Sequence, residues 1–239
     1  MSIKDKITDE YIRDLLVRMA HHSTAIEGNT LTLDENISIL IKYYIPKEMP
    51  EKSYNEVRNY RELFPILLNL LDKKEKEIKV EEIKDYNKII MANLSDDAGQ
   101  YKKVANIILG AEFEPVKPYQ VPYVMQEWCD NYNFRIKNAK TDEEKVEIIL
   151  DQHIKFERIH PFGDGNGRTG RLLIIDSCLR ENLVPIIIPK EEKTKYIEFL
   201  ANEDSKNFTK WALELQKKEL DSFSRYSTGK NATNWLAFL

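Results

Sequence analysis

Twelve consecutive residues, HPFGDGNGRTGR from His160 to Arg171, combine glycines with two arginines, an aspartate and a histidine. Glycines let neighbouring backbone N–H groups converge without obstruction from Cβ atoms, and such a nest binds anions. A helix that begins near Gly167 would add its positive N-terminal end to the same place. Arg168 and Arg171 in the first turns of that helix would oppose its dipole. Their presence therefore indicates a strongly anionic ligand such as a polyphosphate.

A proton acceptor and a carboxylate accompany this nest. His160 lies at its edge, fixed by Pro161, and an imidazole exchanges protons near neutral pH. Asp164 alone is a poor metal site, but it suffices for Mg²⁺ that is shared with phosphate oxygens. An isolated histidine at a helix end more often caps carbonyl groups, yet the surrounding glycines and arginines favour the catalytic interpretation. We expect Phe162 to anchor the loop on the core.

Gly165, Gly167 and Gly170 also satisfy the dinucleotide-binding pattern G-x-G-x-x-G. That pattern requires a buried strand before the first glycine and a βαβ unit around it. The preceding residues 145–161 read instead as a charged amphipathic helix. The sequence therefore disfavours a Rossmann fold.

The elements that must position the motif have a helical apolar period almost throughout. Thr32 with Glu35 and Thr141 with Glu144 mark helix starts. Residues 104–121 are the exception, because a β-branched run, a glycine and a proline-rich return predict a short hairpin. The segment 224–234 reads as a polar linker. The apolar stripes cover residues 12–26, 37–44, 57–71, 80–90, 125–132, 148–156, 172–179 and 199–220.

Composition narrows the class of protein, with 42% hydrophobic residues, 32% charged residues and a net charge of −4 among 239 residues. A negative net charge gives no bulk attraction to nucleic acid or to an anionic membrane. No apolar run approaches the roughly 18 residues of a membrane span, and the N-terminus lacks a signal-peptide core. Cys129 and Cys178 have no CxxC spacing and read as structural thiols. We expect a cytoplasmic protein without nucleic-acid or membrane partners.

The motif resembles the signature of the Fic (filamentation induced by cAMP) family. That signature is a histidine, any residue, Phe, any residue, Asp or Glu, then GNGR and a second arginine three residues later. Every position is present from His160 to Arg171, and the resemblance extends from about Ile12 to about Leu215. It implies an all-α fold of about eight helices with a β-hairpin flap near the active site. Most characterised members transfer AMP from ATP to a protein hydroxyl.

The resemblance therefore implies a protein adenylyltransferase that uses ATP and modifies Ser, Thr or Tyr hydroxyls of proteins, its own among them. It makes His160 the base that deprotonates the hydroxyl, and Asp164 the ligand of Mg²⁺, with Mn²⁺ as an alternative. Backbone N–H groups would form an anion hole, and Arg171 would bind the γ-phosphate. The implied phosphate-binding residues are Asp164, Gly165, Asn166, Gly167, Arg168, Thr169, Gly170 and Arg171.

Two further regions receive roles from the resemblance. The flap would pair with the target chain by strand addition, and Tyr196 would lie near the base or ribose of the nucleotide. Ile197 and Asp204 depart from a relative that has tyrosine and asparagine there, which leaves the nucleotide preference open. Gly99 to Lys102 departs as well, with lysine where many members have arginine. The implied flap residues are Ile107, Ile108, Leu109 and Gly110.

A second motif, STAIEGN from Ser23 to Asn29, lies far upstream. Ser23 and Glu27 are four apart and share one face of a helix, with Gly28 at a plausible C-terminal cap. The motif resembles the family's inhibitory signature of Ser or Thr, three residues, Glu, and Gly or Asn. The resemblance implies that Glu27 pairs with Arg171 in the place of the γ-phosphate, so that ATP binds unproductively.

Alternatives remain open at this point. They are removal of AMP, transfer of another phosphate-containing group, and a catalytically idle nucleotide-sensing module. The sequence leaves open the target, the modified residue, a homodimer and the signal that relieves inhibition. We divide the chain into an N-terminal region at 1–50 with the inhibitory helix, a Fic core at 51–223 and a tail at 224–239.

Overall fold

The structure, a computed structural model, describes residues 7–72, 76–106 and 113–227. Within these ranges the regular structure is helical, and the β contact is an isolated bridge between Tyr101 and Phe162. The expected all-α class is confirmed. The helices are α1 (Asp9–Ile26), α2 (Leu33–Leu40), α3 (Glu51–Arg58), η2 (Asn59–Leu63), α4 (Phe64–Asp72), α5 (Val80–Ile90), η3 (Pro118–Gln120), α6 (Val121–Asn138), α7 (Asp142–Ile159), α8 (Asn166–Arg180), η4 (Lys190–Glu192), α9 (Lys193–Ala201) and α10 (Ser205–Ser227).

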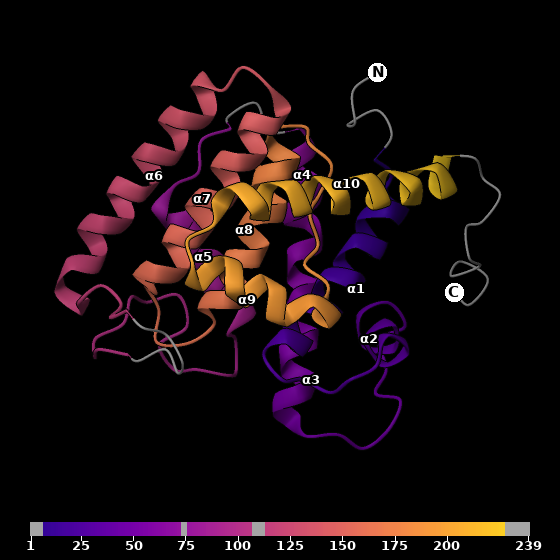
Figure 1. Ribbon diagram of the computed structural model, residues 1–239. Helices are drawn as coiled ribbons and strands as arrows, with labels where there is room; N and C mark the ends of the chain where they lie inside the picture. Colours follow the sequence, from indigo (N-terminus) through magenta and orange to yellow (C-terminus); the bar gives the residue numbers. More distant parts are fainter. Residues whose placement is uncertain (1–6, 73–75, 107–112, 228–239) are drawn as a thin grey trace.

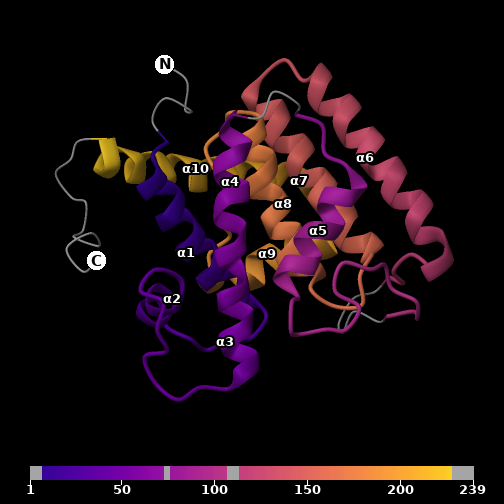
Figure 2. The ribbon, with the colours of Figure 1, turned by 180° about the vertical axis from the view of Figure 1, so that it is seen from behind.

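Helix α8 runs through the middle of the bundle (Figures 1 and 2). It packs against α7, α5, α4 and α1, and nearly all of its side chains are buried. Helix α7 also contacts α6 and α10. A helix that is covered on every side cannot shift without repacking its neighbours. The bundle therefore fixes the start of α8, where the glycine-rich motif lies.

Side-chain caps begin the helices where the sequence predicts them. Thr32 and Glu35 form a reciprocal capping box at the start of α2. The Thr141 hydroxyl accepts from the backbone N–H of Glu144 at 3.1 Å at the start of α7. Such caps satisfy N–H groups that have no acceptor inside the helix.

The stripe over residues 57–71 is not one continuous helix. Helix α3 tightens into the 3₁₀ segment η2 before α4 begins at Phe64. Pro65 explains the break, because it has no N–H to donate and it clashes with the turn before it. The segment from 224 is corrected as well, since α10 continues through Ser227 into the expected linker.

The flap residues Ile107, Ile108, Leu109 and Gly110 lie outside the described residues. At the far end of the expected hairpin, Pro118–Gln120 form the 3₁₀ turn η3 rather than a strand. Proline fixes φ near the helical value and lacks the N–H that a strand would donate. The expected hairpin over 104–121 therefore does not extend to its C-terminal end.

Two further observations bear on the expectations from composition. Cys129 and Cys178 are buried free thiols, and burial raises the pKa of each to about 12, which agrees with structural roles. Among the described residues, no helix combines the length and the apolar character needed to cross a bilayer.

Candidate active site

The loop between α7 and α8 has two residues in the left-handed conformation. His160 ends α7 with φ 51°, which is uncommon for a residue with a side chain. Gly165 precedes α8 with φ 79°, and a Cβ there would lie 2.6 Å from Sδ of Met91. Only glycine fits that position without displacing α5. Unusual backbone at a non-glycine residue often accompanies a functional site.

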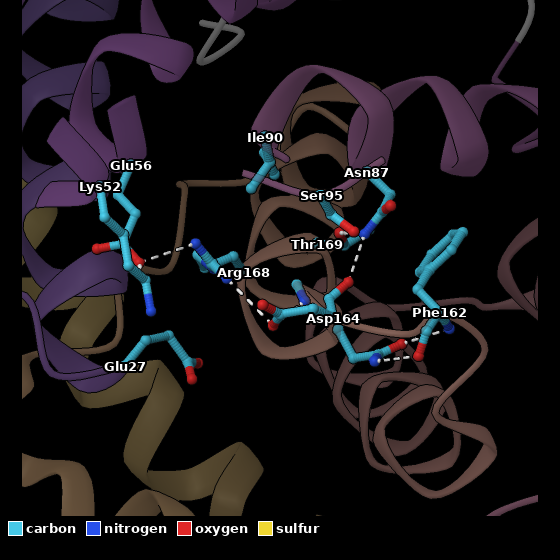
Figure 3. Close-up of polar contacts among 12 residues, drawn as sticks. Glu27, Lys52, Glu56, Asn87, Ile90, Ser95, Phe162, Asp164, Arg168 and Thr169 are labelled. Carbon is cyan, nitrogen blue, oxygen red and sulfur yellow. Dashed lines mark hydrogen bonds and ion pairs between the residues drawn. The ribbon is translucent and has the colours of Figure 1, made fainter. Parts of the chain in front are cut away.

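Side chains of the motif itself close this loop. The Asn166 side chain accepts from the Phe162 N–H and donates to the Phe162 carbonyl oxygen, each at 2.9 Å (Figure 3). Phe162 is 1% exposed and packs near Phe156 and Tyr101, which confirms its expected anchoring role. Asn166 is buried, and both ends of its side-chain amide are engaged by Phe162.

Asn87 on α5 holds the loop from the other side, although no sequence pattern indicated it. Its Nδ2 donates to the Asp164 carbonyl oxygen at 3.0 Å and to the Thr169 hydroxyl at 3.3 Å (Figure 3). Its Oδ1 accepts from the Gly99 N–H at 2.9 Å. Thr169 is fully buried and supports the loop through its hydrogen bond with Asn87, and its contact with a phosphate stays a prediction.

The start of α8 provides the expected anion-binding geometry. The N–H groups of Asn166, Gly167 and Arg168 lie in the first turn, where a helix offers them no internal acceptor. Gly165 has no side chain with which to cap them. The Asp164 side chain is 63% exposed beside this helix end, and its Oδ1 accepts from the Gly165 N–H at 2.5 Å. A phosphate group would satisfy the free donors and the helix dipole together.

His160 is half-buried at the edge of this nest. Its Nδ1 lies 3.3 Å from the Glu157 carbonyl oxygen. Because a carbonyl oxygen can only accept, Nδ1 must carry the hydrogen, and Nε2 keeps its lone pair. Burial lowers the pKa of His160 below its ordinary value, and the nearby Lys102 adds to that effect. The imidazole is therefore neutral at physiological pH and able to accept a proton.

The expected contact between Arg171 and Glu27 is present. Nη2 of Arg171 donates to Oε1 of Glu27 at 2.6 Å, although the two residues are 144 positions apart. Ser23 receives two further hydrogen bonds from the same guanidinium, one on its hydroxyl and one on its carbonyl oxygen, each at 3.0 Å. The last turn of α1 therefore lies on Arg171.

Electrostatics favour this pair in its charged form. Burial opposes ionisation of Glu27, but the Arg171 guanidinium outweighs it and lowers the pKa of that carboxyl. Glu27 can lie close to the start of α8 because Gly167 has no side chain. A Cβ at that position would lie 2.5 Å from Oε1 of Glu27. Lys193 donates to the Ile26 carbonyl oxygen at 2.6 Å and so caps the end of α1. Gly28 follows with φ 100° and lets the chain turn away from the site.

Arg168 has its own carboxylate partners, one of which the sequence did not indicate. Its Nη1 donates to Oε1 of Glu56 on α3 at 3.4 Å, and its Nη2 donates to Oδ1 of Asp164 at 3.2 Å (Figure 3). Asn29 donates to Oε2 of Glu56 at 2.9 Å. The segment that follows Glu27 is thus tied to the carboxylate that holds Arg168. Glu56 lies in a polar stretch of an ordinary helix, so no local pattern distinguishes it.

Tyr196 lies deeper than expected for a residue that contacts a nucleotide. It is 1% exposed, and its hydroxyl lies 2.8 Å from Nε2 of His153. The Arg171 guanidinium carbon lies 5.9 Å from the centre of its ring. Tyr196 therefore supports Arg171 from below, and direct contact with a nucleotide stays a prediction.

The remaining positions of interest have distinct surroundings. Gly170 packs against Glu157 and His153 on α7. Ile197 is 45% exposed. Asp204 caps α10, because its Oδ1 accepts from the Asn207 N–H at 3.0 Å. A capping role accounts for the aspartate without a nucleotide.

These observations define an all-helical domain that presents a glycine-rich loop with two arginines at the start of its central helix. Residues 77–176 match the model of the Fic/DOC family, so the chain contains a Fic domain. This range includes the entire motif from His160 to Arg171. The resemblance read from the sequence is therefore confirmed.

Curated relatives carry longer chains. The chain is 28% identical over 186 residues to protein adenylyltransferase fic-1 of Caenorhabditis briggsae, which covers 77% of this chain and 36% of that protein. It is 30% identical over 206 residues to protein adenylyltransferase Fic of Drosophila willistoni, covering 85% of this chain and 40% of that protein. The chain thus spans about two fifths of the length of these relatives.

Solved structures share the fold over most of the chain. A Fic-domain-containing signalling protein from Bacteroides thetaiotaomicron superposes with a TM-score of 0.81 at 25% identity, covering 92% of this chain and 90% of that one. A Fic-1 fragment from Caenorhabditis elegans superposes with a TM-score of 0.72 at 26% identity, covering 91% of this chain and 64% of that one.

Proposed function

We propose that this chain is a protein adenylyltransferase that transfers AMP from ATP to a protein hydroxyl and is restrained by its own Glu27. The observation that carries the proposal is the sharing of one loop by a neutral imidazole, an exposed carboxylate and the uncapped start of a helix with two arginines. Together these groups can bind a polyphosphate and remove a proton beside it. The names of the curated relatives support the same activity.

The phosphates of ATP are bound by the start of α8. The N–H groups of Asn166, Gly167 and Arg168 donate to the α-phosphate and stabilise the negative charge that develops on it, because preformed donors stabilise such charge strongly. Arg171 binds the γ-phosphate once Glu27 has left it. Arg168 binds phosphate while Glu56 keeps its guanidinium beside the loop.

His160 supplies the base. Its Nε2 takes the proton of a Ser, Thr or Tyr hydroxyl as the hydroxyl oxygen bonds to the α-phosphorus. The bond from that phosphorus to the bridging oxygen breaks, and diphosphate leaves with the electron pair. The Nδ1 hydrogen bond to Glu157 keeps the ring in the tautomer that this step needs. Hydroxyl groups of the protein itself are among the acceptors we propose.

Asp164 would hold Mg²⁺ or Mn²⁺, which when bound neutralises phosphate charge. The described residues contain no group of three His, Cys, Asp or Glu side chains that could hold a metal ion alone. One exposed carboxylate beside an anion nest fits a metal ion that shares its ligands with a nucleotide. The donor set therefore fits a metal that arrives with ATP.

This donor set predicts how the metal binds. Calorimetric titration of Mg²⁺ into the protein should show weak binding without nucleotide and clear binding with ATP present, because phosphate oxygens complete the site. Asp164→Asn should weaken the second binding. Tight binding of Mg²⁺ to the nucleotide-free protein would contradict the arrangement.

Glu27 is the restraint in this proposal. Its carboxylate occupies Arg171, so a nucleotide that enters cannot engage that guanidinium with its γ-phosphate. Ser23 holds the same arginine through two hydrogen bonds and keeps α1 in register. We keep the division into an inhibitory N-terminal region at 1–50, a Fic core at 51–223 and a tail at 224–239. The family match at 77–176 falls inside that core.

Mass spectrometry tests the activity directly. The purified protein is incubated with ATP and Mg²⁺, alone and with a cell lysate, and peptides that have gained one AMP group are sought. We expect such peptides with the wild-type protein, and more with Glu27→Gly, but none with His160→Ala. If Glu27→Gly modifies neither itself nor any lysate protein, the proposed activity is wrong.

A further inference from the structure

The segment that precedes the flap residues lies directly against the loop that carries His160. We call residues 101–106 the flap root. Tyr101 bridges to Phe162, and the Lys102 N–H donates to the Pro161 carbonyl oxygen at 2.9 Å. Asn106 donates through Nδ2 to the Phe162 carbonyl oxygen at 3.0 Å. The flap root therefore holds the two residues that follow His160.

The Lys102 side chain reaches the residue that precedes His160. Its Nζ donates to the Ile159 carbonyl oxygen at 3.3 Å and to Oδ1 of Asn106 at 2.8 Å. Together with its backbone N–H, Lys102 thus spans the loop on both sides of the imidazole. Lys102 and Asn106 bind each other, and together they bind the carbonyl groups of Ile159, Pro161 and Phe162, on both sides of His160.

The burial of Lys102 is unusual. It is 4% exposed, and both described partners of its ammonium group are neutral oxygens. Lysine is rarely buried without a carboxylate, because desolvation of its charge is costly. Burial lowers the pKa of Lys102 to about 8. If Lys102 served only to hold the loop, its two side-chain hydrogen bonds would suffice, and a neutral side chain can also make them. Its positive charge therefore needs another explanation.

His160 is surrounded by charges of both signs. Lys102 faces it from the flap root, Asp164 from its own loop and Glu27 from the end of α1. Glu157 on α7 contributes its carbonyl oxygen to Nδ1. The two carboxylates favour the imidazolium form, whereas Lys102 is the cation that opposes it. Burial is the main influence that disfavours the imidazolium form, and Lys102 adds to it against the two carboxylates.

We propose that Lys102 and Asn106 are positioning residues for His160, with Asn106 holding the loop and the Lys102 ammonium keeping the imidazole uncharged so that it can accept a proton. This rests on the proposed function, because an uncharged imidazole matters for transfer only if His160 is the base. Neither residue donates to the groups that hold Arg168 or Arg171.

Titration of His160 by NMR tests the electrostatic part without any activity. The chain has four histidines, so the ring signals can be assigned with His160→Asn. His153 and His22 serve as internal references, because burial lowers their pKa values to about 3 and about 4. Removal of a nearby cation should favour the protonated form. We expect Lys102→Met to raise the pKa of His160, with a protonation equilibrium shifted about three- to tenfold.

Two variants separate charge from contact. Lys102→Arg keeps the positive charge and should leave the His160 titration close to wild type. Lys103→Met removes the same charge from the exposed neighbouring position and should also leave it unchanged. A His160 titration that does not move in Lys102→Met, while the reference histidines show a folded protein, would overturn the electrostatic role.

Transfer rates test the positioning part, measured in the Glu27→Gly background. Lys102→Met should shift the acidic limb of the kcat profile to higher pH by the amount seen in the titration, with the KM for ATP unchanged. Asn106→Ala should lower kcat several-fold without moving that limb. An unchanged kcat in Asn106→Ala would overturn its role. If the titration shifts but no variant transfers AMP, the proposed function fails while the electrostatic coupling stands.

Discussion

Single residues hold the two arginines of the proposed phosphate site. Arg171 is held by Ser23 and Glu27, and Arg168 by Glu56 and Asp164. The two glutamates differ in their surroundings, since the side chain of Glu27 is 37% exposed and that of Glu56 is 8% exposed. An exposed pair exchanges more easily with an incoming anion than a buried one. Glu27 is therefore the carboxylate that can give way.

Replacement of the base tests the residue scale. His160→Ala should lower transfer by about 10² to 10⁴-fold, the usual loss when a general base is removed. ATP should still bind, because the imidazole does not supply charge to the nest. Transfer kinetics and calorimetric binding of ATP measure the two effects separately. A variant that keeps most of its transfer rate would show that another group removes the proton.

The motif residues could be predicted from the sequence because they are contiguous and their types are unusual together. Asn87 and Glu56 could not, since each is one polar residue on an ordinary helix. Asn87 gains its role only when α5 packs beside α8, and Glu56 only when the fold brings it to Arg168. The family resemblance suggested a nucleotide contact for Tyr196. Packing buries this residue beside Arg171, and the contact stays a prediction. The break in the 57–71 stripe is caused by Pro65, and the spacing of the apolar residues does not reveal such a break.

At the scale of elements, both α5 and α8 position the loop. Helix α8 supplies the donors, while Asn87 on α5 binds the Asp164 carbonyl group, Thr169 and Gly99. Met91, just beyond the end of α5, closes the space next to Gly165. The loop is thus positioned by its contacts with a neighbouring helix as well as by its own glycines.

Loss of the Asn87 contacts should reduce the transfer rate by more than the loss of folding stability alone explains. Asn87→Ala leaves buried groups without partners and should lower the free energy of unfolding by about 1 to 3 kcal/mol. It should also lower transfer by about tenfold or more, because the displaced loop misaligns the donors. Chemical denaturation and transfer kinetics measure the two effects.

Asn133→Ala is the matched control. Asn133 also makes hydrogen bonds through both ends of its amide, but these go to the N–H and carbonyl groups of Ile78, which lies outside the motif and its loop. It should lose comparable stability and keep its transfer rate. Equal loss of activity in the two variants would mean that stability, and not loop position, explains the effect.

At the scale of the whole molecule, the N-terminal helices and the central helix are joined through charged groups. The end of α1 contributes Glu27 to Arg171, and α3 contributes Glu56 to Arg168. Asn29, two residues after Glu27, donates to Glu56. Beneath them Glu157 on α7 is buried beside Gly170 and His153. Burial raises the pKa of Glu157 to about 8. The interior of the site therefore holds a carboxyl group that stays protonated near neutral pH.

Stability should depend on pH through this group. Between about pH 4.5 and 8 the unfolded chain has released the Glu157 proton while the folded protein retains it, so folding becomes less favourable as pH rises. Glu157→Gln removes that dependence. Calorimetry should show the variant gaining stability relative to wild type between pH 5 and pH 8, by roughly 2 to 4 kcal/mol. A difference between the two proteins that is the same at both pH values would contradict a protonated Glu157.

Labelling with α-labelled ATP tests the central claim most directly, that an AMP-transferring site is restrained by contact between Glu27 and Arg171. Four proteins are compared: wild type, Glu27→Gly, Ser23→Ala, and the double variant Glu27→Gly with Arg171→Ala. Glu27→Gly should label about tenfold or more above wild type, since the partly exposed pair is readily broken. Ser23→Ala should rise less, and the double variant should stay slow because the released guanidinium is absent. Equal labelling by wild type and Glu27→Gly would contradict the restraint.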